Sequence, residues 1–214
     1  MIELEDKVDK KTIKKFNQQF WVVHREHNQP TLLTDVDEAY TQNDQRKTAL
    51  RWCKKFRGCI DIGSNVGLWT RELASRFEQV YCFDPNPIFI ECFKKNITET
   101  NVQLFQYGLS DKEHTAFMIE FNSTIMIKGP GNIKCRTLDS FNLNDIDLIK
   151  IDVDGFEVKV LQGAVDTINR NKAVINVEMK KYKRPKTCNK IRKILHRLNY
   201  RYMKRTKSDE IWVK

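Results

Sequence analysis

The sequence lacks the long apolar runs and the paired cysteine motifs that mark several large classes of protein. No apolar run approaches the roughly 20 residues that a membrane-spanning helix requires, so we expect no membrane span. The six cysteines show neither CxxC nor Cys/His ligand spacing, and nothing at the N-terminus resembles a signal peptide. These absences predict reduced thiols, no bound metal and a cytoplasmic location, in a bacterial cell or in a virus-infected host cell.

The length of the chain sets the expected domain organisation. With 214 residues, one domain can bury a core that needs no disulfide or metal to stabilise it. We expect residues 57–214 to form the body of this domain, and residues 1–56 to be an N-terminal extension of the same domain that caps a binding cleft. His24 and His27 in the extension have the spacing of a ligand pair, but no cysteine or carboxylate arrangement completes a metal site.

Positive charge is present in excess, and it is concentrated in one segment. The chain has 38 Lys and Arg residues against 28 Asp and Glu, which gives a formal net charge of +10. Between Lys180 and Lys207 there are 13 Lys and Arg residues and no acidic residue. Such a segment can attract RNA, an anionic glycan or a phosphorylated substrate, and it can equally be the solvated face of a helix.

Short apolar runs alternate with helical segments through the middle of the chain. Strands are predicted at residues 20–23, 59–62, 80–84, 102–106, 115–121, 147–153 and 173–179. Helices are predicted at about residues 44–56, 67–76, 87–96 and 157–169. The last two strands are apolar enough to be buried parallel strands, and the alternation is typical of an open α/β sheet with helices on both faces.

The C-terminal segment departs from this alternation. Ile191, Ile194, Leu195 and Leu198 recur at the spacing of one apolar helix face, with Lys and Arg residues on the other face. The runs YRYMKR and EIWVK then flank TKSD, which is a hairpin signal. The sequence therefore predicts a mostly parallel sheet that ends in an antiparallel hairpin.

The segment CIDIGSNVGLWT, residues 59–70, joins the first parallel strand to its helix, where open α/β sheets bind ligands. It is one glycine short of the GxGxxG dinucleotide fingerprint, and Gly67 is not followed by the Lys and Ser/Thr of a phosphate-binding P-loop. What remains is DxGxxxG, with Asp61, Gly63 and Gly67. Glycine at these two places allows backbone torsions or a close approach that a β-carbon would prevent.

A second acidic residue supports the choice of ligand. Asp84 ends the next strand in CFDPNP, 21 residues after Gly63, where a carboxylate can accept hydrogen bonds from both hydroxyl groups of a ribose. The glycine loop and Asp84 together indicate a ligand that carries adenosine.

The segments CIDIGSNVGLWT, VYCFDPNP, CRTLDSFNLNDIDLIKIDVDGFEVKVLQGA and VINVEMK resemble the FkbM family of S-adenosylmethionine-dependent methyltransferases. The KxDxxGxE pattern, formed by Lys150, Asp152, Gly155 and Glu157, is the most specific part of the resemblance. It implies a Rossmann-like class I methyltransferase fold with a seven-stranded sheet, and O-methylation of a sugar, a glycan or another small hydroxylated metabolite. Where family members typically carry DVEG, this chain has DVDG.

The resemblance also implies which residues bind S-adenosylmethionine. The methionine part would lie against the glycine loop, with Asp61 near the ammonium group, and Asp84 would hold the ribose. Leu109 and Ser110 follow the third strand, where such proteins commonly contact adenine. The full predicted cofactor set is Asp61, Gly63, Ser64, Asn65, Gly67, Asp84, Pro85, Leu109, Ser110 and Asp152.

Two carboxylates are candidates for catalysis. Methyl transfer to a hydroxyl depends mainly on positioning, but a base that takes the hydroxyl proton would help. Asp152 and Glu178 each end a parallel strand next to the first loop and are our predicted catalytic residues. Helix capping by Asp152 and a surface ion pair of Glu178 are the structural alternatives.

Two other functions remain open from the sequence. The first is RNA 2′-O-methylation, which would use the basic segment to bind RNA and would recruit Lys150, Asp152 and Glu178 to a catalytic cluster. Against it, Lys150 lies within an otherwise buried strand. The second is a module that binds S-adenosylmethionine without catalysing transfer.

Overall fold

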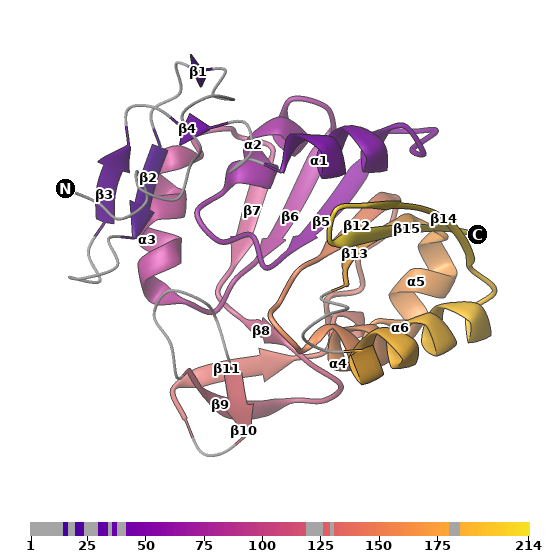
Figure 1. The fold of residues 1–214 in the computed structure, drawn as a ribbon. Coiled ribbons are helices and arrows are strands. Elements are labelled where there is room, and N and C mark those ends of the chain that lie inside the picture. The colour runs from indigo at the N-terminus through magenta and orange to yellow at the C-terminus, as the bar shows by residue number, and fades with distance from the viewer. Residues whose placement is uncertain are drawn as a thin grey trace.

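A computed structural model of the chain describes residues 15–16, 20–23, 30–33, 36–37, 42–118, 126–128, 131–179 and 185–214. Its centre is a seven-stranded sheet in the order β14-β15-β13-β12-β5-β6-β7 (Figure 1). The five parallel strands are β5 (Gly58–Ile62), β6 (Gln79–Phe83), β7 (Val102–Phe105), β12 (Ile146–Ile151) and β13 (Val174–Glu178). The hairpin of β14 (Arg201–Thr206) and β15 (Asp209–Val213) completes the sheet, and β15 pairs antiparallel to β13. The predicted sheet and its reversed hairpin are confirmed.

Helices cover both faces of this sheet. One face packs against α1 (Asn43–Leu50), α2 (Leu68–Ala74) and α3 (Pro87–Asn96), and the other against α4 (Glu157–Gln162), α5 (Val165–Asn171) and α6 (Pro185–Arg197). Strand residues alternate between the two faces because the strand period is two. Cys59 and Leu148 therefore face α2, whereas Ile60 and Ile149 face the α4–α6 layer.

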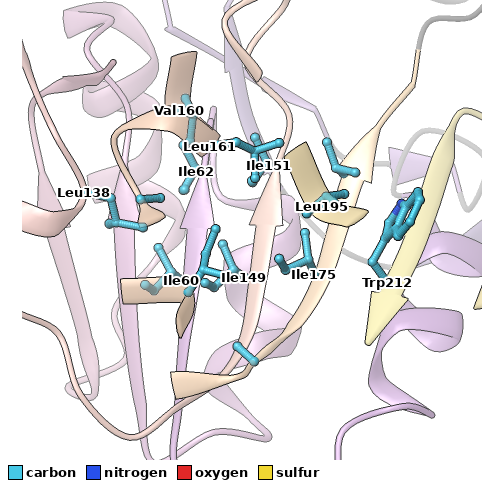
Figure 2. Close-up of a cluster of buried hydrophobic side chains, with 14 of the residues drawn as sticks. Ile60, Ile62, Leu138, Ile149, Ile151, Val160, Leu161, Ile175, Leu195 and Trp212 are labelled. Atoms are coloured by element: carbon cyan, nitrogen blue, oxygen red, sulfur yellow. The ribbon is translucent and has the colours of Figure 1, made fainter. Parts of the chain in front are cut away.

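The layer between the sheet and α4–α6 holds the larger hydrophobic core (Figure 2). Ile60, Ile149 and Ile175 project from three adjacent strands toward Leu161 of α4 and Leu195 of α6, and each has an exposed fraction of zero. The predicted apolar face of the C-terminal helix lies here, with Ile191 and Leu195 buried and Ile194 and Leu198 packed against the core. This packing fixes the parallel strands whose carboxyl ends carry the site.

Two predicted helices differ from those in the structure: one is divided and the other ends earlier. The helix expected over residues 157–169 is divided into α4 and α5 at Gly163, where a β-carbon would lie 2.0 Å from the carbonyl oxygen of Ser110. The helix expected to reach Phe56 ends at Leu50. Arg57 then binds the carboxylate of Asp147 through its backbone N–H (2.9 Å) and its guanidinium group, which leads the chain into β5.

A second, four-stranded sheet lies beside the central one, in the order β10-β9-β11-β8 (Figure 1). It consists of β8 (Gly108–Leu109), β9 (His114–Met118), β10 (Met126–Lys128) and β11 (Ile133–Arg136), and a 3-10 turn at Asp139–Phe141 follows it. The sequence predicted only an extended segment over 115–121. The remaining strands were not predicted because they are short and lack clear alternation.

Near the N-terminus, β2 (Phe20–Val23) and β3 (Pro30–Leu33) form an antiparallel hairpin, and β2 lies beside α3. The short strands β1 (Lys15–Phe16) and β4 (Val36–Asp37) also pair. His24 and His27 lie outside the described residues. Among the residues that the structure describes, no helix is both long and apolar enough to cross a bilayer.

Candidate active site

A cavity of about 320 Å³ opens at the carboxyl edge of the parallel strands. The loops that follow β5, β6, β7 and β12 surround it, together with the last residue of β13 and the residue before α1. These segments contribute Gln42, Ile62, Gly63, Ser64, Asn65, Val66, Leu68, Trp69, Phe83, Asp84, Pro85, Tyr107, Gly108, Leu109, Lys150, Asp152, Val153, Asp154 and Glu178. Seven of the ten predicted cofactor residues and both predicted catalytic residues line this cavity.

The glycine loop forms one wall of the cavity. The backbone N–H groups of Gly63 and Ser64 both donate to the carbonyl oxygen of Phe83, at 2.9 and 3.2 Å, which ties the loop to β6. Gly63 has a φ of 77°, and a β-carbon there would lie 1.9 Å from the carbonyl oxygen of Asp152. Glycine at 63 therefore lets the loop after β5 lie directly against the loop after β12.

Gly67 does not line the cavity, although the sequence placed it at the methionine part of a cofactor. Its φ of 94° places it at the left-handed start of α2. A β-carbon there would meet side-chain atoms of Ile97 at 2.8 Å and of Phe93 at 3.3 Å. In this structure, Gly67 lets α2 approach the end of α3.

Asp61 lies beneath the glycine loop and is fully buried. Its Oδ2 accepts a hydrogen bond from Thr70 Oγ1 at 2.8 Å, and its Oδ1 lies 3.0 Å from Lys150 Nζ. Thr70 and Lys150 thus hold the two carboxylate oxygens, and Asp61 lies outside the lining of the cavity. Of these two neighbours, Lys150 lines the cavity. The predicted contact of Asp61 with the ammonium group of a cofactor stays a prediction.

Lys150 is the cationic partner of Asp61, and the sequence placed it in the site only under the RNA 2′-O-methylation alternative. The two are cross-strand neighbours on β12 and β5, and Lys150 Nζ also donates to the carbonyl oxygen of Gly63 at 2.7 Å. Burial opposes the charged form, but the nearby carboxylates of Asp61 and Asp152 outweigh it and raise the pKa of Lys150. A lysine held as an ammonium ion is a poor base, which disfavours Lys150 as the base of an RNA 2′-O-methylation mechanism.

Asp84 faces the cavity from the end of β6. Its Oδ2 accepts from the backbone N–H of Asn65 and its Oδ1 from that of Asn86, each at 2.9 Å. Burial raises the pKa of Asp84 to about 6, although these two hydrogen bonds favour the charged form. Both oxygens are thus fixed by backbone groups, and each keeps a lone pair for a further donor.

Ser64 provides a polar atom that lacks a protein partner. Its side chain is 3% exposed, and its Oγ makes no hydrogen bond with the described part of the chain. Because a buried hydroxyl without a partner is costly, this atom is suited to bind a ligand in the cavity.

The segment after β7 contributes an apolar wall. Tyr107, Gly108 and Leu109 line the cavity, as does Pro85. Ser110, which the resemblance paired with Leu109, is buried outside the lining: its backbone N–H donates to Arg136 and its Oγ to Asp111. The sequence could not separate these two neighbours, because their burial depends on the second sheet.

The predicted catalytic carboxylates come from adjacent strands. Asp152 directly follows β12, and its backbone N–H donates to the carbonyl oxygen of Ile62 at 3.1 Å. Glu178 is the last residue of β13 and is 8% exposed. Asp154, with a φ of 50°, also lines the cavity. These carboxylates face a space in which Lys150 is the one cation among the described lining residues.

Gln42 and Trp69 were not predicted from the sequence. Trp69 Nε1 donates to Gln42 Oε1 at 2.5 Å, which joins the start of α1 to the start of α2 at the cavity. Gln42 carries no recognisable motif, so only its position in the fold identifies it.

Comparisons with known proteins all find similarity to methyltransferases. A family model described as the methyltransferase FkbM domain matches residues 61–202. The hexuronic acid methyltransferase AglP of Haloferax volcanii is 27% identical over a match that covers 54% of this chain and 53% of that protein. The chain therefore spans about half the length of this curated relative.

Solved structures share the fold at lower identity. The methyltransferase FkbM from Methylobacillus flagellatus KT gives a TM-score of 0.53 at 16% identity, over 74% of this chain and 44% of that one. A putative methyltransferase from Streptococcus mutans, solved in complex with SAH, gives a TM-score of 0.52 at 12% identity, over 80% and 95% of the two chains. Both similarities concern the Rossmann-like methyltransferase fold.

Proposed function

The chain belongs to the FkbM family of methyltransferases, and from this premise we propose that it transfers a methyl group from S-adenosylmethionine to a hydroxyl oxygen of a sugar. The observation that carries the proposal is the arrangement of Asp84 and the glycine loop around one cavity. A carboxylate that can accept hydrogen bonds from ribose hydroxyls and a polar glycine loop follow neighbouring strands, which supports an adenosine-bearing ligand.

The residues present fit S-adenosylmethionine. The Asp84 carboxylate is held by two backbone N–H groups and can accept from the two hydroxyls of a ribose. The Ser64 hydroxyl is buried without a protein partner and can bind a polar group of the methionine part. Tyr107 and Leu109 offer an apolar wall for adenine. The excess of carboxylates over cations in the lining suits a cofactor that carries a sulfonium charge.

We assign the binding roles accordingly. Gly63, Ser64 and Asn65 would hold the methionine part, Asp84 the ribose, and Leu109 the adenine. The cofactor supplies an activated methyl group on a sulfonium whose departure leaves a neutral thioether. The protein therefore has to align the acceptor oxygen and exclude water, and positioning accounts for most of the acceleration.

The acceptor hydroxyl must also lose its proton. Asp152 and Glu178 are the two carboxylates at the carboxyl edge next to the glycine loop, and either can accept this proton as a general base. Lys150 has a different role, because its ammonium group is committed to Asp61 and to the Gly63 carbonyl. It holds the glycine loop and balances the negative charge of Asp61.

A sugar is favoured as the acceptor because the AglP relative is described as a hexuronic acid methyltransferase. RNA 2′-O-methylation remains an alternative for the acceptor, since ribose also presents a hydroxyl, but it would have to proceed without Lys150 as the base. The proposal does not require a metal, and no cluster of metal-ligating side chains occurs among the described residues.

Transfer of labelled methyl groups tests the proposal. The full chain is incubated with S-adenosylmethionine carrying a radioactive methyl group and with separate fractions of glycans, lipids, RNA and small metabolites. We expect label in the glycan or sugar fraction, and loss of that label with the Asp84→Ala variant. Label in the RNA fraction alone would contradict the sugar acceptor, and label in no fraction would support a binding module without catalysis.

A further inference from the structure

The outer face of α6 carries a row of positive charge that the methyltransferase site does not use. Lys186, Lys190, Lys193 and Arg197 are all exposed and recur at helical spacings of three or four residues. Helix geometry places successive members about 4.5–6 Å apart along the axis. The described part of the chain forms no ion pair with any of these four side chains.

The opposite face of α6 is fixed in the core. Cys188, Ile191 and Leu195 are buried, with exposed fractions of at most 2%. The helix therefore has no free apolar face to insert into a membrane interface, as a membrane-bound amphipathic helix would. The described residues also place no large exposed aliphatic side chain on α6.

An exposed aromatic ring lies beside this row. Tyr202 of β14 is 49% exposed, and its ring meets Trp212 edge-on at 5.7 Å. Exposed His196 of α6 packs on the same Trp212 at 5.1 Å, so the two rings lie on the α6 side of the hairpin. Trp212 is 1% exposed and holds both rings in place.

Glu210 of β15, the strand paired with β14, is already neutralised by two arginines. Glu210 is 2% exposed and pairs with Arg192 Nη2 at 2.5 Å and with Arg205 Nη1 at 3.7 Å. The hydrogen bond that Arg192 donates to the Glu210 carboxylate raises the pKa of Arg192, which keeps this guanidinium charged. The surface formed by the outer side of α6 and by β14 therefore carries a net positive charge that Glu210 does not balance.

The face also reaches the active-site edge of the sheet. Arg205 Nη2 donates to the carbonyl oxygen of Met179 at 3.1 Å, and Met179 follows the cavity residue Glu178. At the same edge, Met179 N donates to Ser208 O at 2.7 Å in the turn between β14 and β15. A polymer bound along α6 would thus have one end near the cavity.

We propose that the α6–β14 face, defined by Lys186, Lys190, Lys193, Arg197 and Tyr202, binds single-stranded RNA. Regularly spaced cations follow a phosphate backbone, and a braced exposed ring offers a stacking surface for a base. This inference concerns binding, goes beyond the proposed methyl transfer, and holds for any methyl acceptor. An acidic glycan or an anionic membrane would use the charge but would gain nothing specific from base stacking.

Fluorescence anisotropy with a labelled oligouridylate of about 12 nucleotides tests the proposal on the full chain, over a series of salt concentrations. The charge variant is Lys186→Glu/Lys190→Glu/Lys193→Glu. Its matched control, Lys54→Glu/Lys94→Glu/Lys112→Glu, makes the same change in net charge at exposed lysines outside α6. We expect the first variant to lose at least about tenfold in affinity at low salt and to reduce the log–log salt slope by about 2, since each phosphate contact on a single strand contributes about 0.7. The control should lose much less.

The ring is tested separately, with Tyr202→Ala and with Tyr202→Phe as the variant that keeps a stacking surface. We expect Tyr202→Ala to weaken oligouridylate binding at least about fivefold, within the range for one stacked base, and Tyr202→Phe to retain it. Binding of heparin should be unchanged in both variants. All variants should bind S-adenosylhomocysteine as the unmodified chain does, which would show that they are folded.

Four results would overturn the proposal. They are no oligouridylate binding by the unmodified chain at low salt, equal losses in the two triple variants, an unchanged affinity for Tyr202→Ala, and tighter binding to a polyuronate or to phosphatidylserine vesicles than to the oligonucleotide. The last result would assign the face to an acidic glycan or to a membrane surface.

Discussion

Lys150 and Asp61 meet beneath the glycine loop as cross-strand neighbours, with Lys150 Nζ 3.0 Å from Asp61 Oδ1. Both side chains are buried, and the same ammonium group donates to the carbonyl oxygen of Gly63 at 2.7 Å. One cation therefore fixes the loop against β12 and balances a carboxylate that has no access to water. The motif residues Asp61, Gly63 and Lys150 form one structural unit.

Removing this cation should be costly. We expect Lys150→Met to lower the free energy of unfolding by about 3–5 kcal/mol, because it leaves the Asp61 carboxylate buried without a counter-charge. The double variant Lys150→Met/Asp61→Asn should recover a large part of this loss, since no charge is then left unpaired. Urea denaturation followed by circular dichroism measures both. A single variant as stable as the unmodified chain would contradict the role of the pair.

The two glycines of the loop should respond differently to alanine. Gly63→Ala would place a methyl group 1.9 Å from a backbone oxygen of Asp152, so the loop must move and cofactor binding should fall at least about tenfold. Gly67→Ala would instead press on the side chains of Ile97 and Phe93, which can shift. We expect it to lower stability while changing the affinity for S-adenosylhomocysteine by less than about threefold. Isothermal titration calorimetry separates the two variants, and equal effects on affinity would argue against the assignment.

Binding of the cofactor should weaken at acid pH through Asp84. Burial raises the pKa of Asp84 from 3.8 to about 6, so below pH 6 the side chain is protonated and loses acceptor capacity for the ribose hydroxyls. We expect the dissociation constant of S-adenosylhomocysteine to be nearly constant above pH 7 and to rise toward tenfold per pH unit below 6. Calorimetry from pH 5 to 8 measures this, and a flat profile would contradict it.

The same carboxyl affects the stability of the free protein in the opposite direction. Its folded-state pKa is raised, so protonation of Asp84 stabilises the fold fully below about pH 3.8, and this contribution is lost as the pH rises through 6. Asp84→Asn should therefore remove one pH-dependent component of the unfolding free energy between pH 4 and 6. An unchanged pH dependence in the variant would contradict the raised pKa.

Asn96 should connect the N-terminal hairpin to the glycine loop. Its side chain accepts from Trp21 N at 2.7 Å and donates to Trp21 O at 2.8 Å and to Val66 O at 2.7 Å. We expect Asn96→Ala to cost about 1–3 kcal/mol for each buried group left unsatisfied, and to speed amide exchange at Trp21. Hydrogen-exchange mass spectrometry checks this. Unchanged exchange at Trp21 would speak against the prediction that residues 1–56 belong to the same domain.

The two candidate bases should be separable by kinetics once an acceptor fraction is labelled. Replacing the true base, by Asp152→Asn or Glu178→Gln, should lower the transfer rate by about 10²–10⁴ and remove the acidic limb of its pH profile. The other substitution should leave the shape of that profile unchanged. If neither variant alters the profile, positioning alone accounts for transfer and neither carboxylate is a base.

Much of the fold could be predicted because its strands and helices have clear sequence periods. The apolar runs at β5, β6, β12 and β13, and the hairpin signal at TKSD, each correspond to an observed element. The second sheet could not be predicted in this way, since its strands are short. The division between α4 and α5 was also missed, because Gly163 is required by its close contacts with Ser110 and Thr137, which are distant in the sequence.

The site shows a similar limit. Gly63 and Asp84 could be placed at the cavity from their positions at strand ends. Gly67 and Asp61 belong to the same motif but lie outside the cavity lining. Gly67 packs against Phe93 of α3, and Asp61 pairs with Lys150 of β12, so their places depend on residues from other elements. Lys150 itself was predicted to be buried. Its contact with the glycine loop could not be predicted, because it depends on the pairing of β12 with β5.

The most direct test of the central claim is a thermal-shift measurement of the full chain with S-adenosylhomocysteine and, separately, with NAD at the same concentration. A ligand that binds the folded state at about 100 times its dissociation constant stabilises it by about 2.7 kcal/mol, which raises the melting temperature by several degrees. We predict such a rise with S-adenosylhomocysteine, its loss in Asp84→Ala, and no rise with NAD. A rise with NAD, or none with S-adenosylhomocysteine, would contradict the account.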